Sequence, residues 1–263
     1  MVPKFTFHFS PFTFPFSPLT LAVNPIPQGF SKLFLKYLVE TLVTLKVSIV
    51  LRAEGHMEIH KRILQKATDL FVRYGIRSIT MDEIALQLGI SKKTIYQFFA
   101  DKDELVDAVT VGMLGHSQNC CEADKAGAEN AIHEVFLAME MVKEMFEHMN
   151  PSMLYDLEKY HPQSYEKFTE YKYNFLYRVI KENLERGLKE ELYRPDIDIR
   201  IITMLRLETI MFPFNRQVLS KTKFNVGEIQ TQVIEHYLFG IASLKGYKLI
   251  LKHKEERKKI KAL

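Results

Sequence analysis

The stretch Ile90–Leu105, ISKKTIYQFFADKDEL, decides the fold of this chain of 263 residues. Its first half groups two lysines, a threonine and a tyrosine, and two adjacent phenylalanines follow directly. A solvated surface helix does not usually carry Phe98 and Phe99 together, because exposed aromatic pairs leave apolar surface in water. The polar half therefore predicts a surface that meets a partner, and the aromatic half predicts packing against other helices.

Helix-start and helix-stop residues around this stretch predict two short helices joined by a tight turn. Thr80 followed by Glu83 has the pattern of a capping box, in which both side chains satisfy backbone N–H groups at a helix start. Gly89 can end that helix, and Ser91 can cap the next helix two residues later. Two helices joined so closely must cross steeply, which predicts a helix-turn-helix over residues 81–100.

Apolar residues at three- and four-residue spacing predict a longer helix on each side. The earlier one runs from about residue 59 to residue 74 and ends before Gly75, which suits a left-handed helix end. The later one starts at a second capping box, Asp101 with Glu104. We therefore expect an all-α chain with a three-helix domain, containing the helix-turn-helix, over residues 57–117.

The polar face of the second short helix predicts DNA as the partner. The second helix of a helix-turn-helix lies in the major groove, with its first side chains on the base edges. Those positions hold Lys92, Lys93 and Thr94, and no acid stands in the turn or in this helix. Residues 57–102 carry eight bases and five acids, a local charge of +3, although the whole chain has a net charge of only +4. The alternative interpretation is a solvated lysine face on a small helical bundle.

Residues 63–109 resemble the DNA-binding domain of TetR-type transcriptional regulators. The resemblance has no gap, and it includes the end of the first helix, the run from Gly75 to Ala85 and the run from Gly89 to Leu105. It implies phosphate contacts by Thr80 and by Lys102, groove contacts by the start of the recognition helix, and a phosphate or thymine-methyl contact by Tyr96. The implied DNA-binding residues are Thr80, Ser91, Lys92, Lys93, Thr94, Tyr96, Gln97 and Lys102.

Two positions depart from the usual pattern of the family. Gln97 stands where histidine is common, and Lys93 occupies a variable position that is often small. Both positions lie in the recognition helix. They are therefore expected to change which bases are recognised, and not whether DNA is bound.

The remaining residues, 118–263, show helical periodicity and no strand or hairpin signals. The resemblance to the family implies that these residues form a helical ligand-binding and dimerisation domain, in a TetR-like fold of about nine helices. A homodimer on a palindromic double-stranded operator is expected independently, because one recognition helix reads too few base pairs for useful specificity. The expected helices lie near residues 127–148, 150–160, 163–187, 196–218 and 226–253.

In the family, the last two long helices pair with their twins to form the dimer interface. Apolar residues in the last two predicted helices fit this role, and packing inside the subunit is the alternative for each of them. The candidates are Ile201, Leu205, Ile210, Phe214, Ile229, Val233, Tyr237, Phe239 and Ile241.

Methionines and aromatic residues in the middle helices suggest an adaptable apolar pocket. Such a pocket would hold a small apolar or amphipathic effector that releases the protein, as a repressor, from its operator. The same residues also suit an ordinary helical core, and the sequence leaves both interpretations open. The candidate ligand-binding residues are Met139, Phe146, Met149, Tyr155, Tyr173 and Tyr177.

Residues 1–56 differ from the rest of the chain and are expected to be a non-native or disordered extension. They contain two acids and five bases, and their first thirty residues are rich in Phe, Pro, Ser and Thr. The codons of Glu54–Met57 form a purine-rich run before a Met codon, which predicts a native start at Met57. The apolar stretch 31–51 leaves a membrane anchor as an alternative, although Lys36, Glu40 and Lys46 fall inside it.

The sequence contains no enzymatic, metal-binding or cofactor-binding motif with the required spacing. We therefore expect no catalytic residues, no metal and no cofactor. The two cysteines, Cys120 and Cys121, are adjacent and cannot form a disulfide framework, which favours the reducing cytoplasm. Vicinal thiols also occur in redox sensors, and the sequence leaves that alternative open.

Overall fold

The computed structural model describes residues 32–214 and 225–261, and it divides into two compact units, Met1–Glu54 and Gly55–Leu263. The described residues of the first unit are helical and form the beginning of helix α1, Lys32–Tyr74. The sequence predicts this helix only from about residue 59. The helix extends back to Lys32 because residues 32–54 contain neither proline nor glycine. Most of the predicted extension, residues 1–31, lies outside the described residues.

The first helix of the helix-turn-helix begins at residue 81 and ends before Gly89, as predicted. Helix α2 is Met81–Leu88, the recognition helix α3 is Lys92–Tyr96, and α4 is Lys102–Gly127. The Thr80 hydroxyl accepts from the Glu83 N–H at 3.1 Å, which forms its half of the capping box, while the Glu83 carboxylate accepts from the Gln87 side chain. Gly89 ends α2 at φ +66°, the left-handed conformation that glycine adopts without strain.

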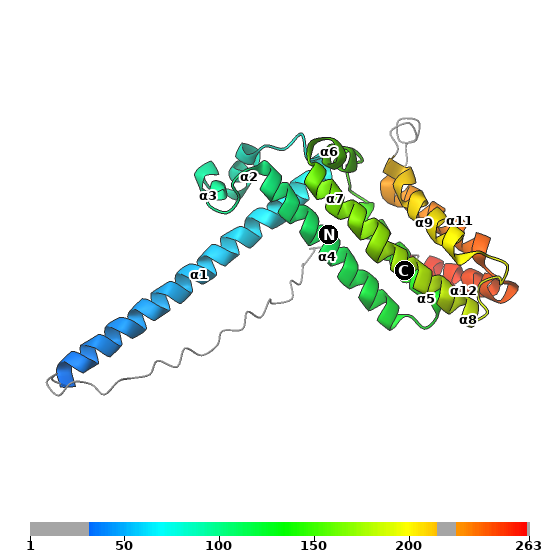
Figure 1. Cartoon of the computed structure of the whole chain (residues 1–263), viewed down its shortest axis with the longest axis horizontal. Helices are drawn as coiled ribbons and strands as arrows, with labels where there is room; N and C mark the ends of the chain where they lie inside the picture. The colour runs from blue at the N-terminus through cyan, green and yellow to red at the C-terminus, as the bar shows by residue number, and fades with distance from the viewer. Residues whose placement is uncertain (1–31, 215–224, 262–263) are drawn as a thin grey trace. The chain divides into compact units, whose positions relative to one another are not determined.

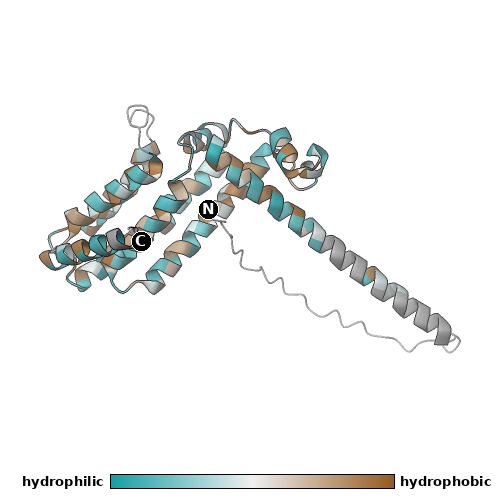
Figure 2. Cartoon of the chain, turned by 180° about the vertical axis from the view of Figure 1, so that it is seen from behind, coloured by the Kyte–Doolittle hydropathy of each residue, from teal (hydrophilic) through white to brown (hydrophobic). Residues whose placement is uncertain are grey.

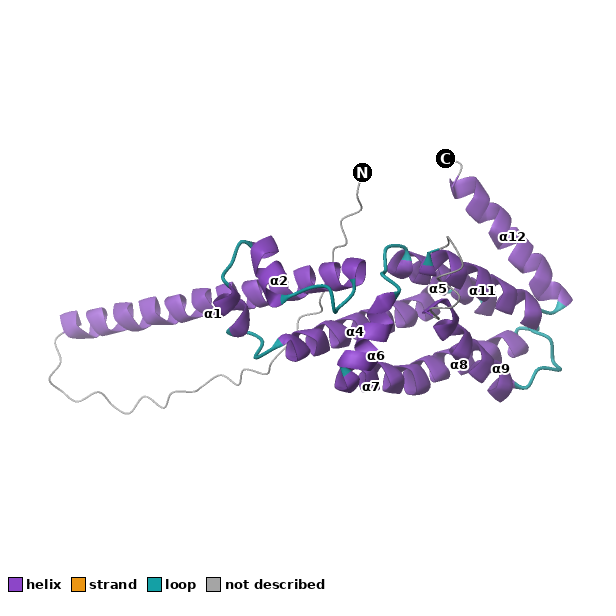
Figure 3. Ribbon diagram, turned by 90° about the horizontal axis from the view of Figure 1, so that it is seen from above, coloured by secondary structure: helices purple, strands orange, loops and turns teal. Residues whose placement is uncertain are grey.

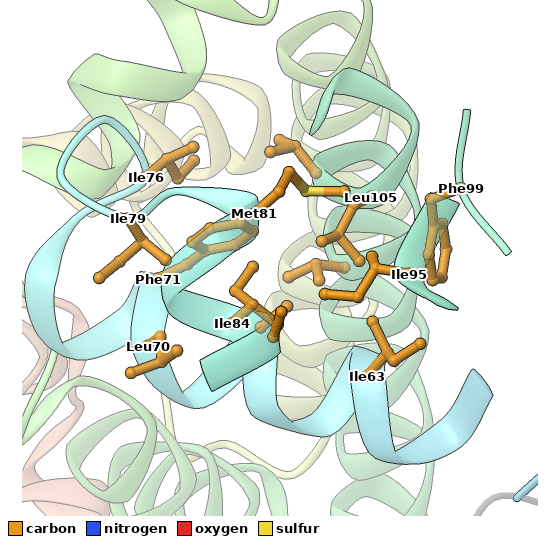
Figure 4. Packing of buried hydrophobic residues seen from close by; sticks show 14 of the residues in the cluster. Ile63, Leu70, Phe71, Ile76, Ile79, Met81, Ile84, Ile95, Phe99 and Leu105 are labelled. Atoms are coloured by element: carbon orange, nitrogen blue, oxygen red, sulfur yellow. The ribbon is translucent and has the colours of Figure 1, made fainter. Parts of the chain in front are cut away.

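The phenylalanines of the opening stretch pack as predicted. Phe99 is buried and its ring stacks on His60, with 5.1 Å between the centroids. Phe98 is half-buried, and its ring lies 4.1 Å from that of His56. Around them, side chains from α1, α2, α3 and α4 form one apolar core, which includes Ile63, Phe71, Ile84, Ile95 and Leu105 (Figure 4).

Helix α4 crosses residue 117, the predicted domain boundary, without a break and ends at Gly127. The elements after α4 are α5 Ala131–Phe146, α6 Ser152–Tyr160, α7 Pro162–Glu170, the π-helical η1 Tyr171–Leu176, α8 Tyr177–Lys189, α9 Ile199–Met211, the 3₁₀ turn η2 Phe212–Phe214, α11 Val226–Ile241 and α12 Leu244–Lys261. The α7, η1 and α8 segments together form one continuous helical run close to the predicted helix 163–187, and α7 packs along α4 (Figure 1).

The single helix predicted over 226–253 is wrong, because the chain breaks between α11 and α12. Ala242 adopts an extended conformation and forms an isolated bridge with Tyr193. The Arg194 N–H donates to the Ile241 carbonyl, and the Ser243 N–H donates to the Leu192 carbonyl, both at 2.9 Å. This pairing with a distant loop overrides the helical periodicity, which continues on both sides of the break.

A second apolar core lies among α5, α8, α11 and α12. Helices α5 and α11 run side by side (Figure 3), and Ile132, Leu184, Leu238 and Ile250 are fully buried between these elements. Each helix carries hydrophilic and hydrophobic residues together, so each buries one face and leaves the other in water (Figure 2). In the described part of the chain the architecture is all-α, as predicted.

Candidate DNA-binding surface and ligand cavity

The recognition helix presents a short polar turn on the surface. Ser91 caps it: the hydroxyl accepts from the Thr94 N–H at 3.0 Å, and the two hydroxyls lie 2.8 Å apart. Ser91 and Thr94 thus fix the start of α3, whereas the longer side chains of the turn extend into solvent. The exposed predicted residues are Thr80, Ser91, Lys92, Lys93, Tyr96 and Gln97, and Thr94 is half-buried.

An acid of helix α2, Asp82, lies beside this turn. The Lys92 ammonium lies 2.6 Å from the Asp82 carboxylate, and the hydrogen bond with Asp82 raises the pKa of Lys92. Asp82 is ten residues away in the sequence, but the steep crossing of α2 and α3 brings it close. Lys93 forms no ion pair with an acid of the described residues, so it is the recognition lysine whose charge is uncompensated.

Lys102 makes contacts within the protein that the resemblance does not include. Its ammonium donates to the carbonyls of Ile76 and Ile79, both at 2.6 Å, and lies over the ring of Phe71. Burial lowers the pKa of Lys102. Two of its three N–H groups therefore fasten the start of α4 to the loop before α2, and one remains for a phosphate.

Helix α6 and the residues beside it are bonded directly to the DNA-binding region. The buried Asp156 carboxylate accepts from the Arg77 N–H at 3.0 Å, and the Asn150 N–H donates to the Val72 carbonyl at 2.6 Å. At the start of α4, His161 lies 2.6 Å from the Asp103 carboxylate. The loop that follows α1 and the start of α4 are thus held by the same short helix.

Helix α6 also lines a cavity of about 250 Å³ between α4, α5, α8, α9 and α11. Of the candidate ligand residues, Phe146 and Met149 line this cavity. Met139, Tyr155, Tyr173 and Tyr177 are not among the lining residues: Met139, for example, is fully buried in the second core. The apolar walls include Met113, Met141, Val142, Met145, Met153, Leu157, Phe168, Ile210, Phe214 and Ile234.

Several polar groups also face the cavity, and the sequence did not single them out. Burial lowers the pKa of Arg206 to about 10, so the guanidinium stays protonated at neutral pH. Gln230 is 1 % exposed, and its amide donates to the Ile210 carbonyl at 2.6 Å. Asp124 and Glu134 line another part of the wall, where burial raises the pKa of Asp124.

Comparison with known proteins identifies the DNA-binding region. The sequence model described as bacterial regulatory proteins, tetR family, matches residues 63–109, the range that carries the resemblance. The chain therefore contains a tetR-type DNA-binding region. Two curated relatives that it matches are named as HTH-type transcriptional regulators.

Relatives and solved structures extend the likeness beyond the helix-turn-helix. The uncharacterized HTH-type transcriptional regulator YvaF of Bacillus subtilis is 24% identical over 193 residues, which is 70% of this chain and 95% of YvaF. A transcriptional regulator from Saccharomonospora viridis, solved with choline, has a TM-score of 0.58 at 18% identity, covering 71% of this chain and 99% of that one. The ketosteroid regulator KstR2 of Mycobacterium tuberculosis has a TM-score of 0.52 at 19% identity, covering 70% and 95%. These similarities show a TetR-like fold.

Helix α9 exposes an apolar stripe. Ile201 is 66% exposed and Leu205 is 53% exposed, and Met204 and Phe212 lie on the same side of the helix. Other candidate interface residues point inward: Ile241 is buried in the second core, and Tyr237 lines the cavity. The candidates that remain half-buried are Ile210, Phe214, Ile229, Val233 and Phe239.

Among the described residues, no helix combines the length and apolar character that crossing a bilayer requires. In the same part of the chain, no group of three or more His, Cys, Asp or Glu side chains is arranged to hold a metal ion.

Proposed function

We propose that this regulator is a cytoplasmic repressor that binds a palindromic operator as a homodimer. A small apolar or amphipathic molecule, bound in the cavity between α4 and α11, releases it. The observation that carries the proposal is the position of α6. This helix borders the cavity, and its other contacts lead directly to the DNA-binding region.

Recognition of the operator is assigned to the exposed turn at α3. Lys92, Lys93 and Gln97 can reach base edges, because long donors at the start of a recognition helix lie in the major groove. Contacts with the phosphates of the DNA backbone are assigned to Thr80, Tyr96 and the third N–H of Lys102. This division predicts that substitutions in α3 change the preferred sequence, while substitutions at the phosphate-contacting positions weaken binding to every sequence.

Release is assigned to α6 together with α4. Met153 and Leu157 of α6 contribute to the apolar core of the DNA-binding region and also line the cavity. Thr110 and Met113 of α4 line it too. A ligand that separates these helices changes the spacing of the two recognition helices in a dimer. It does so only to the extent that it binds the two spacings with different affinity, and a 100-fold preference corresponds to about 2.7 kcal/mol.

The test begins with an operator obtained by binding-site selection on random DNA. The expected result is a palindromic sequence bound by a dimer, measured by light scattering and fluorescence anisotropy. A thermal-shift screen then identifies compounds that stabilise the free protein, and each is tested for release of the operator. Monomers on DNA would contradict the dimer, and stabilising compounds that never change operator affinity would contradict release by a ligand.

A further inference from the structure

We infer that the cavity is built for an amphipathic anion, whose carboxylate pairs with Arg206 while its apolar tail lies among the methionines. This inference rests on the proposed function, because it names the chemical class of the effector. Arg206 lies on α9, at the part of the wall where Ile210 and Tyr237 face the same space.

The charge of Arg206 has no counterion in the described protein. Its guanidinium lies 5.8 Å from the centre of the Tyr237 ring, and one of its N–H groups lies 3.3 Å from the Thr209 hydroxyl. No Asp or Glu of the described residues forms an ion pair with it. The nearby acid on the same helix, Glu208, is held by Lys172 at 3.0 Å and by the Tyr173 hydroxyl at 2.9 Å.

Residues 215–224, which lie outside the described range, offer no negative side chain as a counterion. They contain three bases and no acid. A buried charge without a partner is strongly unfavourable, and a protein normally pairs it or neutralises it. Because the pKa of Arg206 is lowered only to about 10, the group remains a cation at neutral pH. A ligand carboxylate provides the bidentate partner that a guanidinium prefers.

Gln230 marks the same wall as polar. It is 1% exposed, its N–H₂ group is used by the Ile210 carbonyl, and its side-chain oxygen has no hydrogen-bond partner among the described residues. It lies seven residues, about two helical turns, before Tyr237 on α11. An arginine without a counterion and an amide oxygen without a hydrogen-bond partner, both in the described residues of one wall, indicate a ligand that is polar at this end.

The two acids that line the cavity, Asp124 and Glu134, form no ion pair with Arg206. Glu134 is already paired with Arg186 at 3.1 Å. Asp124 has one oxygen without a partner in the described residues, and burial raises its pKa, which favours the neutral form. A cationic ligand held by Asp124 is therefore the competing outcome of the test.

The volume sets the length of the tail. At about 30 Å³ per water molecule, a cavity of about 250 Å³ holds roughly eight waters. This corresponds to a chain of roughly eight carbons. Met141, Met145 and Met149 line the apolar part, and their flexible side chains adapt to such a chain. Octanoate is therefore a suitable probe, with 1-octanol and octylammonium as probes of the same length and different charge.

The experiment measures the dissociation constant of each probe for the full chain by calorimetry, together with the thermal shift. Octanoate is expected to bind most tightly. The Arg206→Met and Arg206→Gln substitutions are expected to weaken octanoate roughly 10- to 100-fold, because a charged hydrogen bond is lost. Binding of 1-octanol should not weaken. Arg200→Met is the matched control, because Arg200 is on the same helix but is exposed and paired with Asp198.

Tighter binding of octylammonium, or an unchanged octanoate affinity in both Arg206 variants, would overturn the inference, as would the absence of octanoate binding. Operator release is measured separately by fluorescence anisotropy. If octanoate binds through Arg206 and the operator stays bound, the anion site stands and the proposed release fails. If octanoate does not bind and another class of compound releases the operator, the proposed release by a ligand stands and the anion site fails.

Discussion

At the scale of single residues, the ammonium of Lys102 stabilises the fold through hydrogen bonds to backbone carbonyls. Its two carbonyl partners, on Ile76 and Ile79, lie in the loop that positions α2. The resemblance to the family implied only a phosphate as the partner of this lysine. A sequence cannot show these bonds, because they join a side chain to backbone oxygens more than twenty residues earlier.

We expect Lys102→Ala to lower the free energy of unfolding by about 2 kcal/mol, because two half-buried carbonyls lose a charged donor. Urea denaturation measures this change. Lys93→Ala is the control: Lys93 is exposed and unpaired, so its loss should leave stability within about 0.5 kcal/mol and reduce the salt dependence of DNA binding instead. Equal stability of the two variants would show that the Lys102 bonds contribute nothing.

The Asp82–Lys92 pair gives a second prediction at this scale. Asp82→Asn should increase affinity for DNA of any sequence and steepen its salt dependence by up to about one unit, because an ammonium near the phosphates becomes free. Glu83→Gln removes the same charge from the same turn of α2, but Glu83 is bonded to Gln87 and not to a lysine. Anisotropy titrations at several salt concentrations measure both variants. Identical gains would mean that only the net charge matters.

At the scale of elements, local signals predicted the helix-turn-helix closely and the later helices only roughly. Thr80, Gly89, Ser91 and Asp101 are caps whose partners lie within three or four residues, so the sequence alone determines them. The break between α11 and α12 was missed because its cause, the bridge with Tyr193, lies about fifty residues away. The cavity was predicted in kind from its methionines, but Arg206 and Gln230 look like ordinary helix residues in the sequence.

The two left-handed glycines allow the contact between α1 and α6 to be tested. Gly89 has φ +66° with open space around it, so Gly89→Ala should cost only the conformational strain, about 1 kcal/mol. Gly75 has φ +83°, and a Cβ there would lie 2.6 Å from the Ser152 hydroxyl and 3.2 Å from the Asp156 carboxylate. Gly75→Ala should therefore cost more than Gly89→Ala in thermal or urea unfolding.

Adding Ser152→Ala should restore part of the stability that Gly75→Ala loses, since it removes the closest atom. In the Gly89→Ala background the same second substitution should restore nothing. If Ser152→Ala has the same effect in both backgrounds, the contact between Gly75 and α6 is not the source of the extra cost.

At the scale of the whole molecule, the apolar stripe of α9 is the surface to which we assign the proposed dimer interface. One recognition helix with five helical residues contacts too few bases to select a site, so two copies are needed. An exposed row of Ile201, Met204 and Leu205 is unfavourable in water unless another surface covers it. In the proposed dimer, a second copy of α9 covers this row.

We expect Leu205→Glu to produce a folded monomer, because a charge buried in a symmetric interface meets its own copy. Leu244→Glu is the matched control: Leu244 is 86% exposed at the start of α12, outside the α9 stripe, and its substitution should leave the dimer intact. Sedimentation velocity gives the mass, and circular dichroism reports whether the helices persist. The monomer should also bind a full palindrome no more tightly than a half-site, since the two sites are no longer linked. A Leu205→Glu protein that stays dimeric would move the interface away from α9, and the spacing of the recognition helices would then have to be set by another face of the molecule.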